Sequence, residues 1–153
     1  MVTDHKGFAE IQTPTDILLK LEHDLKRMTS DPFDSYAAFD FFVTAEHILD
    51  WIHPNNRAAR KKIRESDYKL QIVSHLANGI KHFRATAKHH VAVEQVKKEE
   101  GSFSSNSFSS RSFDVGSFKI SGLIVKKDDG EFIHATQLAE DVFKSWEKRL
   151  AQP

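Results

Sequence analysis

Apolar side chains recur at helical spacing in four stretches of the chain, which predicts a mainly α-helical protein. The first stretch begins where Thr13 is the expected N-cap, Pro14 takes the first helical position and Asp16 completes a capping box. The second begins at Asp34-Ser35 and ends before Pro54, since the residue preceding a proline avoids helical backbone angles. Its wide apolar stripe predicts a central helix.

The chain after Pro54 predicts three more helices. Residues 57–64 favour a short basic helix, and Ser66-Asp67 then starts a long amphipathic helix that fades between residues 86 and 90. A last apolar stripe predicts a helix over residues 136–150, with Thr136 as its N-cap.

A β-hairpin is expected just before the last helix. Asp129-Gly130 is typical of the tight turn that joins two antiparallel strands, so residues 119–134 predict a hairpin. The whole pattern predicts one domain over residues 1–153. Its architecture is a four-helix bundle with a core at residues 13–90 and a late β-hairpin inserted before the C-terminal helix.

Residues 99–118 differ from the rest of the chain, because they are rich in Ser and carry Phe at every fifth position. A period of five matches neither a helix face nor a strand face. Two interpretations remain open: an arm whose Phe side chains dock one by one, or a low-complexity loop. Docking onto a partner chain accounts for the unusual total of 12 Phe among 153 residues. The Phe residues of this arm are Phe103, Phe108, Phe113 and Phe118.

Composition narrows the class of protein. No apolar run approaches the roughly 18 residues that a membrane span requires, and the chain has no Cys for disulfides or thiolate chemistry. We therefore expect a soluble cytoplasmic protein with no membrane partner.

The net charge is zero, yet residues 57–98 are basic and residues 1–56 are acidic. The two parts either neutralise each other across the fold or leave a basic surface for a polyanion.

The long amphipathic helix carries the candidate chemistry. His75, Asn78 and His82 are three and four residues apart and so share one helix face. Lys81 and Arg84 extend the basic edge of that face. Histidine is suited to acid–base catalysis near neutral pH, and lysine can hold a phosphate. An ordinary polar helix edge is the alternative interpretation.

Three further features bear on the same site. His47 and Asp50 share a face near the end of the second helix, where Asp50 could orient an imidazole if the helices pack antiparallel. Gly79 lies inside a helix, where glycine costs about 1 kcal/mol relative to alanine, which indicates close approach of a backbone or a ligand. His89-His90 lies in a basic run and lacks a metal-binding pattern, so no metal and no cofactor are expected.

The stretch Asn78-Gly79-Ile80-Lys81-His82-Phe83 resembles the motif of the HEPN superfamily, whose members are small helical bundles of toxin–antitoxin and phage-defence systems. Many members read Arg-Asn-x-x-x-His, and here Asn78 and His82 match while Ala77 takes the position of the Arg. Together with residues 40–51, this stretch also resembles an uncharacterised group of bacterial and phage proteins. The resemblance implies the bundle fold more strongly than the activity.

The resemblance implies a homodimer that binds RNA or a nucleotide phosphate and acts as a metal-independent endoribonuclease. His82 would be the general acid or base, Lys81 the phosphate contact and Asn78 an orienting hydrogen-bonder. Because the Arg is replaced, the charge would come from lysine, which lacks the bidentate fork of a guanidinium. The alternative function is a non-catalytic interaction protein of a phage or defence operon that docks a partner through Phe103, Phe108 and Phe113.

Overall fold

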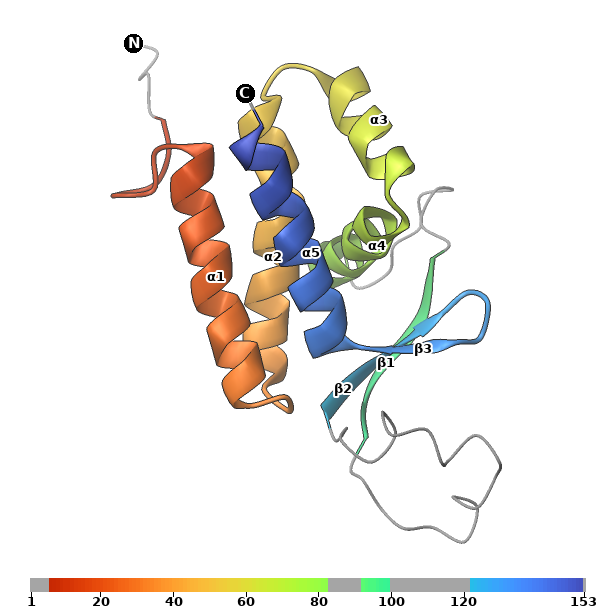
Figure 1. The fold of residues 1–153 in the computed structure, drawn as a ribbon. Helices are drawn as coiled ribbons and strands as arrows, with labels where there is room; N and C mark the ends of the chain where they lie inside the picture. The colour runs from red at the N-terminus through yellow and green to blue at the C-terminus, as the bar shows by residue number, and fades with distance from the viewer. Residues whose placement is uncertain (1–5, 83–91, 100–121, 153) are drawn as a thin grey trace, which may run out of the picture.

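Five helices and three strands make up the described part of the chain in a computed structural model (Figure 1). The structure describes residues 6–82, 92–99 and 122–152. Residues 100–118 of the predicted arm (residues 99–118), the first residues of the predicted hairpin, and Arg84 lie outside the described residues. Glu99, the first residue of that arm, ends a strand. In chain order the elements are α1 (Pro14–Ser30), α2 (Ser35–Ile52), α3 (Arg57–Ser66), α4 (Tyr68–His82), β1 (Val93–Glu99), β2 (Gly122–Lys127), β3 (Phe132–His134) and α5 (Ala135–Ala151).

Local side-chain hydrogen bonds begin the first two helices where the sequence predicts. Thr13 Oγ1 accepts the N–H of Asp16 over 3.2 Å, and the Asp16 carboxylate accepts the N–H of Thr13 over 2.9 Å, which confirms the capping box. The Asp34 carboxylate accepts the N–H groups of Tyr36 and Ala37 at the start of α2. These bonds satisfy backbone donors that a helix leaves unpaired at its first turn.

The predicted N-cap of the last helix is wrong. α5 begins at Ala135, with His134 in the N-cap position and no side-chain capping bond, so Thr136 lies inside the first turn. The reason is tertiary. β3 ends at His134 in extended backbone, and the chain passes from the strand directly into the helix.

The core lies where α2 packs against α1, α4 and α5. In Figure 1, α1, α2 and α5 run alongside one another, while α4 crosses them at an angle. Phe41 of α2 and Trp146 of α5 are among the largest side chains that are fully buried between these helices. The described residues thus form a mainly helical protein with a small antiparallel sheet.

The sheet has the strand order β1-β2-β3, with both neighbouring pairs antiparallel. The β2–β3 hairpin and its Asp129-Gly130 turn confirm the predicted hairpin, and Gly130 supplies a backbone φ of +83°. β1 was not predicted. Its charged sequence becomes a strand by pairing Val96 with Val125 of β2. The sheet packs against α5 and α4, so it closes one side of the helical core.

Candidate functional site on the second half of α4

α4 has one buried face and one exposed face near its end. Leu70, Ile72, Val73 and Leu76 are buried against the core, whereas Lys81 and His82 in the last turn are exposed. The Asp67 carboxylate, which accepts the N–H of Lys69 over 3.0 Å, begins the helix. The amphipathic pattern therefore places the two basic residues in the last turn of α4.

The HEPN-like motif positions divide between core and surface. Ala77, at the position of the family's Arg, is only 8% exposed and faces the core. Asn78 is half-buried, and its Nδ2 donates to the backbone oxygen of Ser74 over 2.8 Å. This bond lies within the helix itself and uses one of the two N–H donors of the amide that was expected to orient a ligand. Lys81 and His82 are the two proposed catalytic residues that reach solvent.

His75 serves as a link between α4 and the sheet. Its Nδ1 accepts the backbone N–H of Val93 over 3.0 Å, and this bond fixes the imidazole in the neutral form with its proton on Nε2. Burial lowers the pKa of His75, and the Asp128 carboxylate opposes that shift in part. His75, which was expected on the helix face of the candidate site, thus positions β1.

His47 and Asp50 form a separate cluster on the last turns of α2. His47 Nδ1 lies 3.4 Å from an Asp50 oxygen, and Arg60 of α3 lies 3.3 Å from the other. The second half of α4 instead lies beside Phe39, about three helical turns away from Asp50 along α2. The structure therefore brings Asp50 to His47 and Arg60, and not to His82.

A partly buried ion pair behind that cluster was not predicted. Glu46 of α2 accepts a hydrogen bond from Arg64 of α3 over 2.5 Å, beside Ser74 of α4. Burial raises the pKa of Glu46, while Arg64 and Ser74 act in the opposite direction. This pair and the Asp50–Arg60 contact join basic side chains of residues 57–98 to acidic side chains of residues 1–56. The two segments therefore neutralise part of each other's charge.

The described residues also include one fully buried carboxylate that was not predicted. Asp24 of α1 is 0% exposed and accepts hydrogen bonds from Lys20 and, over 3.4 Å, from Thr44 of α2. Arg27 lies 3.5 Å from Asp24 and donates to Asp40 over 2.7 Å. A sequence signal existed, because Asp24 falls on the same helix face as the apolar residues Leu21 and Met28.

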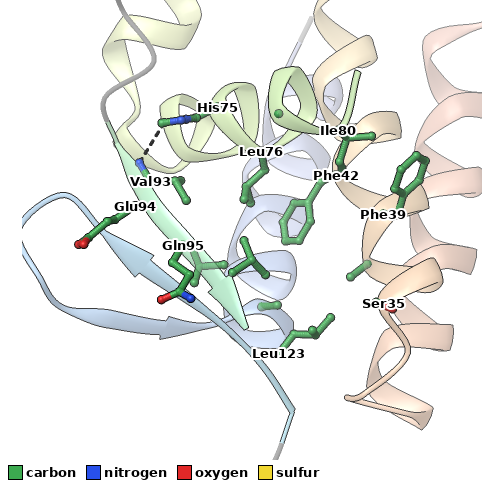
Figure 2. Close-up of a pocket in the computed structure, with 15 residues that line it drawn as sticks. Ser35, Phe39, Phe42, His75, Leu76, Ile80, Val93, Glu94, Gln95 and Leu123 are labelled. Atoms are coloured by element: carbon green, nitrogen blue, oxygen red, sulfur yellow. Dashed lines mark hydrogen bonds between the residues drawn. The ribbon is translucent and has the colours of Figure 1, made fainter. Parts of the chain in front are cut away.

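A pocket of about 400 Å³ lies on the opposite side of α4 from Lys81. Figure 2 shows Phe42 of α2, Leu76 of α4 and Leu123 of β2 around it, and the His75–Val93 bond at its edge. Gly79 lines the pocket, and a Cβ built there meets no described atom within 4 Å. Close approach of another backbone, one of the two interpretations of Gly79, is therefore not found among the described residues.

Across residues 6–82, 92–99 and 122–152, no three His, Asp or Glu side chains are gathered as metal ligands would be. His89-His90 lies outside these ranges. No helix in the described part of the chain is long and apolar enough to cross a membrane.

Comparison with protein families, curated proteins and solved structures found no match for this chain. The expected relationship to the HEPN superfamily therefore rests on the sequence around Asn78 and His82 alone.

Proposed function

We propose that this protein binds RNA or another nucleotide phosphate at the exposed end of α4, as a HEPN-like helical bundle in a toxin–antitoxin or phage-defence setting. The observation that carries the proposal is the environment of the Lys81 and His82 side chains. Both are exposed, and neither side chain has an ion-pair or hydrogen-bond partner among the described residues. Arg60 and Arg64, by contrast, bind carboxylates of α2.

The chemistry of the two side chains suits a phosphate. Lys81 offers a positive charge with three donors, and the imidazole of His82 is a side chain suited to general acid–base catalysis without a metal. A homodimer of the HEPN kind would bring two copies of His82 to one phosphate. Because Ala77 is buried and carries no charge, cleavage in this proposal depends on His82 and Lys81 alone.

Binding is tested with a fluorescently labelled single-stranded RNA, by anisotropy, over a series of salt concentrations. We expect Lys81→Ala to weaken binding about tenfold and to flatten its salt dependence, because one phosphate contact is lost. Lys144→Ala is the matched control, since Lys144 is an exposed lysine on α5. Equal affinity of the Lys81→Ala variant and wild type would refute the phosphate contact.

Cleavage is tested separately, in the presence of a chelator. The proposal expects wild-type protein to cut the RNA and His82→Ala to lose that activity, while His47→Ala, another exposed histidine, retains it. Equal activity in wild type and His82→Ala, or no activity in either, would contradict catalysis by His82. The binding experiment would then stand as a separate test of the phosphate contact.

A specific observation favours a second function, docking of a protein partner. Tyr36 and Phe39 are exposed to 81% and 48% on the first turns of α2, and Phe39 also lines the pocket. Aromatic side chains of this kind are enriched at protein interfaces. The two functions differ in salt dependence: phosphate binding weakens steeply as salt rises, and aromatic docking changes little.

A further inference from the structure

We propose that the pocket between α2, α4 and the sheet is a binding site for a small, uncharged, largely apolar molecule, such as an aromatic or branched aliphatic compound. The site is independent of the proposed phosphate contact, because it lies on the other side of α4 from Lys81.

Side chains from three directions enclose the pocket (Figure 2). α2 contributes Phe39 and Phe42, α4 contributes Leu76 and Ile80, and the strands contribute residues that include Leu123. The volume of about 400 Å³ falls within the range of pockets that bind small molecules. A space of this size that is walled on several sides suits a compact ligand better than an extended chain.

The charges around the pocket favour an uncharged ligand. Glu94 lines the pocket, and its carboxylate is bound by Lys126 over 2.9 Å. His75 accepts the Val93 N–H and is therefore neutral. A charged group in the pocket would lose its water and meet no opposite charge among the described lining residues, unless the Glu94–Lys126 pair broke. Ser35 and Gln95 at the edge can still form hydrogen bonds with a polar substituent.

Gly79 keeps one wall of the pocket open. A Cβ at this position meets no described atom within 4 Å, so the absence of a side chain is not required by helix packing there. A leucine at position 79 can therefore occupy pocket space without displacing the backbone of any described residue. This provides a substitution that fills the site and leaves the core side chains unchanged.

The test uses the full chain and two fluorescent probes with the same ring system. N-phenyl-1-naphthylamine is uncharged, and 8-anilinonaphthalene-1-sulfonate carries a sulfonate. We expect saturable binding of one N-phenyl-1-naphthylamine per chain, at least tenfold tighter than binding of the sulfonate. Gly79→Leu should weaken the binding of N-phenyl-1-naphthylamine at least tenfold.

Two control variants separate filling of the pocket from other effects. Gly79→Ala adds only a methyl group and should retain affinity within about threefold. Ala58→Leu adds leucine to an exposed position of α3 and should also retain it. Circular dichroism establishes that each variant is folded. If Gly79→Leu is unfolded, Ile80→Trp, which enlarges another lining residue, replaces it.

Three results overturn the proposal. The first is failure of N-phenyl-1-naphthylamine to bind the wild-type chain. The second is binding that a folded pocket-filling variant leaves unchanged, which places the probe elsewhere. The third is equal affinity for the sulfonate, which contradicts an uncharged ligand class.

Discussion

The Nδ1 atom of His75 accepts a hydrogen bond from the backbone N–H of Val93 over 3.0 Å, and this bond ties α4 to the first strand of the sheet. Both residues line the pocket, so the link also sets the position of one pocket wall. Protonation of Nδ1 would remove the acceptor. The bond can therefore form only with a neutral imidazole.

We predict that acid weakens this link. The pKa of His75 is lowered in the folded protein, chiefly by burial, so the unfolded chain binds the proton more readily. Stability contributed by neutral His75 is present above its ordinary pKa of 6.5 and is lost as the pH falls below that value. Urea unfolding at pH 8 and pH 5 measures the change.

At pH 8, His75→Ala should lower the free energy of unfolding by about 1–3 kcal/mol, since it leaves the Val93 N–H without its acceptor. The difference from wild type should shrink at pH 5, where the wild-type bond is itself weakened. His82→Ala is the matched control on the same helix, because His82 is exposed. A difference between His75→Ala and wild type that is independent of pH would contradict this account.

Tyr68 links α4 to the turn between β2 and β3, and its pKa is predicted to be shifted. Its hydroxyl donates to Asp128 over 2.8 Å. Burial, followed by this bond and the Asp128 charge, raises the pKa of Tyr68 to about 12. Ultraviolet titration of the Tyr36→Phe variant isolates Tyr68, because the chain has two tyrosines.

The Asp128→Ala change, made in the Tyr36→Phe background, should bring the Tyr68 midpoint down toward 10.0, its ordinary value. Asp141→Ala, a change to a carboxylate of α5, is the control. An unchanged midpoint in the Asp128→Ala variant would show that Asp128 does not act on the phenol.

Loss of the Asp24 charge is predicted to destabilise the α1–α2 contact. Asp24→Asn should lower the free energy of unfolding by about 1–3 kcal/mol, because Lys20 and Arg27 lose their buried carboxylate. The comparison is Glu22→Gln, which removes a more exposed partner of Lys26 and should cost at most about 1 kcal/mol. Denaturant unfolding of both variants checks this, and equal losses would count against it.

Two glycines are predicted to respond in opposite directions to alanine. A Cβ meets no described atom within 4 Å at either Gly79 or Gly130, but Gly130 alone has a positive φ, of +83°. Gly79→Ala should stabilise the protein by about 1 kcal/mol through helix propensity. Gly130→Ala should destabilise it, because alanine is strained at that backbone angle. Thermal unfolding distinguishes the two, and a destabilised Gly79→Ala would indicate contacts beyond the described residues.

Local chemistry explains which features could be predicted from the sequence. The capping box of Thr13 and Asp16, the cap at Asp34 and the turn at Asp129-Gly130 each join residues within a few positions of one another. Such bonds form in the same way wherever the segment lies in the fold. The starts of the first two helices and the turn of the hairpin were accordingly predicted.

Partners distant in the sequence explain what could not be predicted. β1 is a strand because Val96 meets Val125, and its own residues alternate too weakly to show it. The role of His75 depends on Val93, which is 18 positions away. The pairing of Asp50 with Arg60, rather than with an imidazole on α4, likewise required the packing of α3 against its neighbours.

The sequence by itself determined that α4 is an amphipathic helix with Lys81 and His82 at its end, because helical periodicity assigns residues to faces. The tertiary structure decided what each face meets. Ala77 is buried, and His75 accepts a hydrogen bond from the backbone of β1. α2 and the strands line the pocket beside Gly79. The physical reason is that contacts between elements depend on how the whole chain packs, and periodicity within one helix carries no information about its neighbours.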